Sequence, residues 1–375
     1  MLSSTLSVVA IAAALLPATL AQTHTQCNPL NTTGCPNMPA LGGNATFNFN
    51  DTMNDRIWEE KNAGKVDWSD KGTTFTITSR GESPMIQSSF YMLFGRLEVV
   101  MKAAKGKGIV SSAILQSECL DEIDWEFLGS NTTHLLTNYY GKGNTTYGNR
   151  GADFPFSNPQ EDFHNYTVDW TKDRIQWWVD GKQLRELKYA DALGGKNYPQ
   201  TPMNIRLGVW AGGDTAHNDP GVVEWAGGET DFSQQPFQMT VQQVYAQDYT
   251  TGNVKEYSWE NMDASGDWQK VKVIENKAGQ QSTALTEIAK PHGVKNRWAA
   301  LSKGAQIGIV AGVAGFVILS ALFITFCCIK QRRAGRREWA ALRAQEDKEA
   351  AELLAYKNQM ASGKFGHGND YYNRI

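Results

Sequence analysis

The chain has 375 residues, of which 41% are hydrophobic, and its formal net charge is −3. This length suffices for one large domain or two small ones, and the nearly balanced charge implies no nucleic-acid partner. The 35 glycines, together with 12 tryptophans, 13 tyrosines and 15 phenylalanines, predict an all-β body with many turns.

The N-terminus carries a secretion signal. An apolar run from Leu6 to Leu16 is followed by small residues up to Ala21, which is the pattern of a signal peptide cleaved at that point. We therefore predict that residues 1–21 are removed, the alternative being a short apolar tail of a folded domain. Sequons for N-glycosylation agree with secretion. Their asparagines are Asn31, Asn44, Asn50, Asn131, Asn144 and Asn165.

Three cysteines belong to the secreted part of the chain. Cys27 and Cys35 lie close together in the sequence and can close a short disulfide loop in an oxidising compartment. Cys119 is then left without a partner. We interpret it as a small buried apolar residue rather than a reactive thiol, because no histidine lies near it in the sequence.

Short β-rich segments separated by turn residues make up the body. The expected strands are 46–49, 67–68, 73–79, 95–102, 110–115, 120–127, 135–140, 164–170, 174–179, 203–210, 237–248, 257–259 and 268–274. Asp180-Gly181 marks a hairpin turn. Many short strands of this kind predict a sandwich or jelly roll. The pattern is lost in residues 276–304, where we expect a linker.

The C-terminal part of the chain has the composition of a membrane anchor. Residues 305–329 carry no charge and are long enough to cross a bilayer. Lys330 and four arginines follow within eight positions, and basic residues on that side place residues 330–375 in the cytosol. We predict a single-pass protein of the plasma membrane with its folded part outside. A glycolipid-anchor signal would end soon after its apolar tail. Here residues 330–375 follow the apolar run, so we disfavour that alternative.

The most informative stretch is 121–129, DEIDWEFLG, in which acidic and large apolar residues alternate. Successive side chains of a strand point to opposite faces. The acidic residues that would share one face are Glu122, Asp124 and Glu126. The apolar residues that would face the core are Ile123, Trp125 and Phe127. Like charges aligned on a sheet cost stability, so we expect these carboxylates to have a use.

Paired carboxylates suit glycoside cleavage. Two glutamates four positions apart lie about 13 Å apart at Cα, and side chains that lean together can reach the roughly 5–5.5 Å of retaining glycosidases. One would attack the anomeric carbon and the other would protonate the leaving oxygen, while the aspartate holds a proton between them. A calcium site needs more oxygens than this strand supplies, and a solvated face would mix lysine with glutamate. We predict no metal and no cofactor.

Aromatic side chains could bind the apolar faces of sugar rings. The candidates are Tyr139, Tyr140, Phe154, Trp210 and Trp225. Core packing is the alternative for each of them. Trp210 is preferred because the glycines that follow it leave its ring face open.

The acidic stretch resembles a known family. Glu122-Ile123-Asp124-Trp125-Glu126 matches the ExDxE signature of glycoside hydrolase family 16. The segments 210–213 (WAGG) and 224–228 (EWAGG) resemble the paired blocks of fungal Crh-type cell-wall transglycosylases, as does the start Cys27-Asn28-Pro29. The resemblance covers residues 22–275.

This resemblance implies a concanavalin A-like jelly roll of two antiparallel sheets. It implies that Glu122 is the nucleophile, Asp124 the auxiliary carboxylate and Glu126 the general acid/base. It further implies a chitin donor and an acceptor that is β-1,3-glucan, β-1,6-glucan or chitin. Substrate-binding positions carried over from the family are Glu126, Arg206, Trp210 and Val222, the last standing where relatives have threonine. Tyr140 and Trp225 join them as aromatic candidates.

Three functions remain open. The leading one is a membrane-tethered transglycosylase that cross-links cell-wall polysaccharide. A chitin or β-glucan hydrolase of the same fold shares the double displacement and differs only in the acceptor, which is water. A non-catalytic carbohydrate-binding membrane receptor is the third, and the complete set of three carboxylates argues against it.

Overall fold

The computed structural model describes residues 25–146, 148 and 150–362. The predicted signal peptide and the last residues of the predicted tail therefore lie outside the described residues. The chain divides after Arg297 into two compact units, which are treated separately below.

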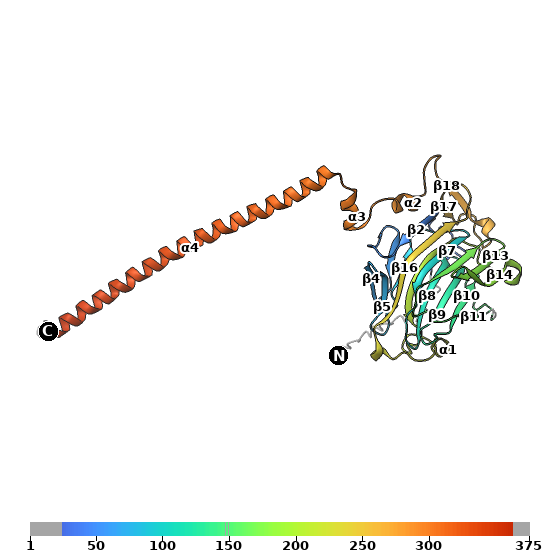
Figure 1. Ribbon diagram of the computed structural model, residues 1–375, viewed down its shortest axis with the longest axis horizontal. Coiled ribbons are helices and arrows are strands. Elements are labelled where there is room, and N and C mark those ends of the chain that lie inside the picture. The colour runs from blue at the N-terminus through green and yellow to red at the C-terminus, as the bar shows by residue number, and fades with distance from the viewer. Residues whose placement is uncertain (1–24, 147, 149, 363–375) are drawn as a thin grey trace, which may run out of the picture. The chain divides into compact units, whose positions relative to one another are not determined.

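Two antiparallel sheets form the body of the first unit (Figure 1). The seven-stranded sheet has the order β11 (Ala152–Pro155), β10 (His134–Tyr140), β9 (Glu122–Leu128), β8 (Ile109–Ser117), β15 (Met203–Ala211), β6 (Met85–Ser88) and β3 (Trp58–Lys61). The eight-stranded sheet has the order β14 (Lys182–Lys188), β13 (Arg174–Val179), β12 (His164–Trp170), β7 (Gly95–Lys102), β16 (Phe237–Asp248), β5 (Gly72–Ile77) and β4 (Lys65–Ser69), with β2 (Asn44–Asn48) also paired to β16.

A smaller sheet and short helices complete the unit. The three-stranded sheet contains β1 (Met38–Pro39), β17 (Val254–Ser258) and β18 (Lys272–Glu275). The short helices are α1 (Pro220–Trp225), η1 (Tyr189–Asp191), η2 (Phe232–Gln234), η3 (Trp268–Lys270) and α2 (Thr283–Ile288). Together these elements confirm the all-β jelly-roll sandwich that the strand pattern predicted.

The core lies between the inner faces of the two large sheets. Strand β7 alternates buried and half-buried residues along its whole length, as a strand with one face on the core should. Across the interface, Trp125 and Phe127 of β9 contact Tyr166 of β12, with ring centroids 5.7 Å and 4.6 Å apart. Aromatic pairs of this kind add stability beyond their buried area, so β9 is anchored by the face opposite its acids.

Two strand boundaries differ from our expectation. Strand β9 begins at Glu122 rather than near Leu120, because Leu120 has a φ of 61° and sits in a left-handed turn. The segment 268–274 is not one strand: it starts as η3, whose N-cap Asp267 accepts a hydrogen bond from the Gln269 amide, and only then becomes β18. The pattern also missed β3, β6 and β11, each of which has only four residues.

The segment that we expected to be a plain linker packs partly against the body. Ser282 is buried, donates its hydroxyl to the Leu41 carbonyl at 2.6 Å and caps α2. Ala284 joins the core, and Glu287 pairs with Arg56 at 3.0 Å. Leu285 and Ile288 also pack against the core, although the sequence of α2 lacks a strand pattern. The body therefore extends beyond residue 275.

The remaining helices follow this segment. They are α3 (Gly293–Ala300) and the 59-residue α4 (Lys303–Ala361). Among the described residues, α4 is the one helix whose length and apolar composition would let it cross a membrane. It contains all of residues 305–329 and also the charged segment after them, which accords with the helical propensity of that segment.

Candidate active site

The three acids predicted to act together share the outer face of β9. Glu122 and Asp124 are fully buried, and Glu126 is 3% exposed. Strand β9 lies between β8 and β10, so each acid has a neighbour on both sides. In the register, Glu122 lies opposite Gln116 and Tyr140, Asp124 opposite Ile114 and Asn138, and Glu126 opposite Ser112 and Leu136.

Asp121 fixes the entry to this strand. Its buried carboxylate accepts hydrogen bonds from the backbone amides of Lys142 at 2.8 Å, Gln200 at 2.8 Å and Thr201 at 3.0 Å, and from the Thr201 hydroxyl at 2.7 Å. Three chain segments are thereby tied together one residue before Glu122. Such bonds to an ionised group are among the stronger ones in proteins, so the first glutamate starts from a rigid point.

Glu122 and Asp124 are positioned to share a proton. Burial raises the pKa of Glu122 to about 7, against the lowering effects of a hydrogen bond with Asp124, of the Arg206 charge and of the 2.7 Å hydrogen bond from the Gln116 amide. Burial, and then the negative charges of Glu122 and Glu126, raise the pKa of Asp124 well above its ordinary value.

A protonated Asp124 also accounts for two of three unpaired oxygens. Both carboxylate oxygens of Asp124 and Oε1 of Glu122 are buried, and no hydrogen-bond donor among the described residues reaches them. Two ionised carboxylates could not help one another, because each can only accept. With the proton on Asp124, the aspartate donates to Glu122, and Glu122 stays ionised. This arrangement gives neighbouring acids different protonation states, as acid–base chemistry requires.

Glu126 lies next to a pair of stacked tryptophans. Ser112, opposite Glu126 in the register, accepts a 3.3 Å hydrogen bond from the Trp210 indole. The Trp210 ring stacks on that of Trp225, with centroids 6.0 Å apart and planes 20° apart. Trp210 comes from β15 and Trp225 from α1, so the fold brings the two tryptophan blocks of the sequence together beside the third acid.

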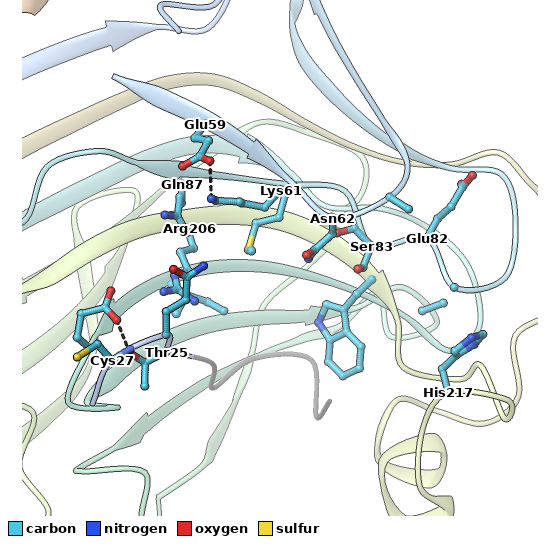
Figure 2. Close-up of a pocket in the computed structure, with 18 of the residues that line it drawn as sticks. Thr25, Cys27, Glu59, Lys61, Asn62, Glu82, Ser83, Gln87, Arg206 and His217 are labelled. Atoms are coloured by element: carbon cyan, nitrogen blue, oxygen red, sulfur yellow. Dashed lines mark hydrogen bonds and ion pairs between the residues drawn. The ribbon is translucent and has the colours of Figure 1, made fainter. Parts of the chain in front are cut away.

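A groove of about 1070 Å³ lies over β15, β6 and β3 and borders this site through Ile114, which lies opposite Asp124, but none of the three acids lines it. Figure 2 shows Arg206, Gln87 and Glu59, which lie opposite one another on these three strands. Lys61 forms a 2.5 Å ion pair with Glu59. The lining is therefore rich in hydrogen-bonding groups, while Trp210 supplies an aromatic face. Such a surface suits a carbohydrate chain.

The N-terminal segment forms one wall of the groove. Cys27 and Cys35 are joined by a disulfide and both line the groove. Thr25 donates its hydroxyl to Glu118, which also accepts a 2.8 Å hydrogen bond from the Tyr91 hydroxyl. These contacts hold the segment against the sheet.

Arg206 lies on the groove floor and is almost fully buried. Its Nε donates to the Asn204 side chain at 3.1 Å. Burial lowers the pKa of its guanidinium, while the charges of Tyr91, Glu118 and Glu122 oppose that effect. The group nevertheless stays cationic, since an arginine is not deprotonated in proteins. Arg206 thus brings a positive charge and several donors close to Glu122.

The other predicted binding residues have different surroundings. Tyr140 is half-buried beside Glu122. Val222 does not line the groove among the described residues; its amide donates to Asp219 and its carbonyl accepts from Ala226 within α1. Tyr139 points to the core and is 1% exposed, because neighbouring residues of a strand face opposite sides. Phe154 also packs partly against the core.

The remaining expectations concern modification sites. Asn31, Asn44 and Asn50 are exposed, whereas Asn131, Asn144 and Asn165 are half-buried. The Asn165 side chain donates to Glu98 at 2.9 Å, which would compete with an attached glycan. Cys119 is a buried free cysteine, and burial raises the pKa of its thiol. Glycosylation stays a prediction at all six positions.

Several residues at the site had no local signal in the sequence. Gln116 reaches Glu122 from the neighbouring strand, and Arg150 approaches from the loop before β11. Asp121 belongs to the acidic stretch, but its role depends on Gln200 and Thr201, far along the chain. Only a known strand order could have pointed to these residues.

Comparisons with known proteins agree with this geometry. Residues 50–227 match the model of glycosyl hydrolases family 16. A Crh-like protein of Arthroderma benhamiae is 48% identical over 95% of this chain and 95% of its own length. Crh-like protein 3 of Aspergillus fumigatus is 44% identical over 97% of this chain and 98% of its own length. The solved structure of a Crh5 transglycosylase in complex with NAG is 47% identical, covers 66% of this chain and all of its own, and has a TM-score of 0.62.

Proposed function

The chain belongs to the Crh-like members of glycosyl hydrolases family 16, and on that premise we propose that it is a cell-wall transglycosylase. It cleaves chitin with retention at the anomeric carbon and transfers the chain to β-1,3-glucan, β-1,6-glucan or another chitin chain. The observation that carries this proposal is the buried Glu122–Asp124 pair on the same strand as Glu126, next to a polar groove that Arg206 and Trp210 line. The similarity to a solved Crh5 transglycosylase supports it.

The first half-reaction uses all three acids. Ionised Glu122 attacks the anomeric carbon and forms a glycosyl–enzyme ester. Glu126 gives its proton to the glycosidic oxygen, so the leaving chain departs as a neutral alcohol. Asp124 keeps its proton throughout and donates a hydrogen bond to Glu122, and it therefore holds the nucleophile ionised without competing for the substrate.

The second half-reaction reverses these roles. Glu126, now ionised, removes the proton from an acceptor hydroxyl, and the acceptor oxygen displaces Glu122 from the anomeric carbon. A sugar hydroxyl as acceptor gives transfer, and water gives hydrolysis. The aromatic pair Trp210 and Trp225, adjacent to Glu126, offers a sugar a platform that water cannot use.

The donor chain is proposed to lie in the groove. Arg206 and Gln87 offer hydrogen-bond donors on its floor, and the N-terminal wall limits its extent. Arg206, Trp210, Trp225, Tyr140 and Glu126 are proposed as substrate contacts. A substrate contact of Val222 is proposed through its side chain alone, because its backbone amide and carbonyl are already hydrogen-bonded at α1.

The position of the enzyme is part of the proposal. Residues 305–329 of α4 would hold the catalytic body at the plasma membrane, with the basic residues after them on the cytosolic side. After removal of residues 1–21, the body faces the cell wall, where its polymers are found.

A donor–acceptor assay tests the activity. Fluorescent chitin oligomers are incubated with the protein and with unlabelled β-1,3-glucan, β-1,6-glucan or chitin oligomers, and the products are separated by size and by enzymatic digestion. We expect labelled hybrid products. After glucanase treatment of a chitin–glucan hybrid, the label should remain on the chitin part. Shortened labelled donor with no hybrid product at any acceptor concentration would identify a hydrolase, and unchanged donor that still binds would identify a receptor.

A further inference from the structure

Arg150 covers the ring of Tyr140 on the side of β9 opposite the groove strands. Its guanidinium carbon lies 4.1 Å from the ring centroid, a favourable cation–π geometry. Its Nη1 donates to the Asn144 carbonyl at 2.5 Å, and its own carbonyl accepts from Arg185 at 2.7 Å. Arg185 in turn donates to the Thr137 hydroxyl of β10 at 2.9 Å. The residue is therefore fixed to β10 by backbone and side chain.

Tyr140 places this cation beside the first acid. Tyr140 and Glu122 are direct partners in the β10–β9 register, and paired residues of an antiparallel sheet project to the same face about 4.5–5.5 Å apart. Burial and the three carboxylates raise the pKa of the Tyr140 phenol to about 12, so the phenol stays neutral. The positive charge of Arg150 acts on both Glu122 and Asp124 and lowers the pKa of each.

The groups facing Glu122 come from every neighbouring element. They are Asp124 from β9, Gln116 from β8, Tyr140 from β10, Arg206 from β15 and Arg150 from the loop before β11. Of the two cations, Arg206 also interacts with the charge of Glu118. Arg206 has the larger effect on the pKa of Glu122 and Arg150 the smaller, whereas Arg150 also lowers the pKa of Asp124.

One nitrogen of the Arg150 guanidinium is an unused hydrogen-bond donor. Its Nε is buried and has no hydrogen-bond partner among the described residues. A buried donor left unpaired costs free energy. The charge of the guanidinium, which acts on two buried acids, explains this unpaired donor better than local packing does.

We propose that Arg150 is a positioning residue for the reaction, one that acts through Glu122 by holding its carboxylate ionised and its neighbour Tyr140 in place. The proposal rests on the proposed function, because it presumes that Glu122 is the nucleophile. Without the Arg150 charge, the ionised form of Glu122 loses stabilisation and its pKa rises. A larger fraction of the enzyme is then protonated, and inactive, at acidic pH.

The test is the pH dependence of transfer by the full chain. kcat/KM is measured from pH 4 to pH 8 for wild type, Arg150→Met and Arg150→Lys, with labelled chitin oligomers and saturating glucan acceptor. The acid limb of this profile reports the ionisation of the free enzyme. We expect Arg150→Met to move that limb upward by about half to one pH unit, which reduces kcat/KM on the limb by about three- to tenfold. Arg150→Lys should restore most of the wild-type profile.

The controls separate charge from structure. Lys182→Met removes an exposed cation from β14 of the other sheet and should leave the profile unchanged. Thermal midpoints are measured first, and Arg150→Gln replaces the methionine variant if the latter does not fold. An equal loss of kcat/KM at every pH, or an unmoved limb, would overturn the proposal. Failure of the proposed function is a different result, since wild type itself would then form no hybrid product.

Discussion

The indole N–H of Trp177 in β13 donates to the backbone carbonyl of Asp124 in β9 at 3.1 Å. The two large sheets are thus joined by a hydrogen bond directly behind the middle acid of the site. Trp177 is fully buried, whereas its neighbour Trp178 points the other way and is half-buried. The core of the sandwich and the chemistry on its outer face therefore depend on the same residue of β9.

Trp177→Phe tests this link. Phenylalanine keeps an aromatic ring but removes the donor and some volume, so we expect a loss of about 1–3 kcal/mol in the free energy of unfolding. The measurement is chemical denaturation of the purified protein. Trp178→Phe is the matched control on the same strand and should cost less, because no partner of its indole nitrogen is found among the described residues. Equal losses in the two variants would contradict the prediction.

Asp124→Asn should stabilise the fold at neutral pH. The pKa of Asp124 is raised above its ordinary value of 3.8 in the folded protein, so the folded state holds a proton that the unfolded chain releases. Stability therefore falls as pH rises from about 4 through the raised pKa. Asparagine has no proton to lose and keeps a donor towards Glu122. We expect a higher melting temperature than wild type at pH 7 and a smaller difference at pH 4.

The measurement for this variant is a series of melting curves between pH 4 and pH 8. Asp191→Asn, an exposed aspartate of η1, serves as the control and should track wild type. If Asp124→Asn has the same pH dependence as wild type, Asp124 does not carry the additional proton.

Glu122→Gln and Glu126→Gln should each abolish transfer without unfolding the protein. Loss of the nucleophile prevents formation of the glycosyl–enzyme, and loss of the acid/base removes a contribution of about 10²–10⁴-fold. Initial rates of hybrid formation are compared with those of Glu224→Gln, a change at an exposed glutamate of α1. Full activity in either catalytic variant would refute its assigned role.

Trp225→Ala should weaken substrate binding at little cost to the fold. The Trp225 side chain is 36% exposed yet stacks on Trp210, so its removal takes away aromatic surface at the site rather than in the core. A stacking contribution of about 0.5–1.5 kcal/mol corresponds to a roughly two- to twelvefold higher KM. Trp225→Phe should recover part of the loss. A KM that does not change would place Trp225 outside the substrate path.

Ser282→Ala should destabilise the catalytic body, although Ser282 lies in the segment expected to be a linker. The change removes both the cap of α2 and the hydrogen bond to Leu41, at a cost of about 0.5–2 kcal/mol. Unfolding of the body is followed by tryptophan fluorescence. Ser302→Ala removes the equivalent cap of α4 and is expected to leave that transition unchanged. A silent Ser282→Ala would show that the hydrogen bonds of Ser282 contribute nothing to the stability of the body.

Much of the site was accessible from local sequence. The alternation in DEIDWEFLG predicted which residues of β9 face the core, because a strand has a strict period of two. The same rule places Tyr139 inside and Tyr140 outside, but periodicity cannot say which of the two parities is outward. That choice depended on the partner strand, in which Tyr140 pairs with Glu122. For the same reason Gln116 and Arg150 could not be identified.

The sequence by itself predicted secretion, and it determined the all-β class of the protein, its apolar C-terminal segment and the three aligned acids of β9. These features depend on composition and on patterns within a few residues. Only the tertiary structure decided that burial raises the pKa of Asp124, that Trp210 meets Trp225, that α2 belongs to the body and that Arg150 covers the ring of Tyr140. Each of these depends on burial or on contacts between segments distant in the chain, and such contacts follow from strand order and packing rather than from local pattern.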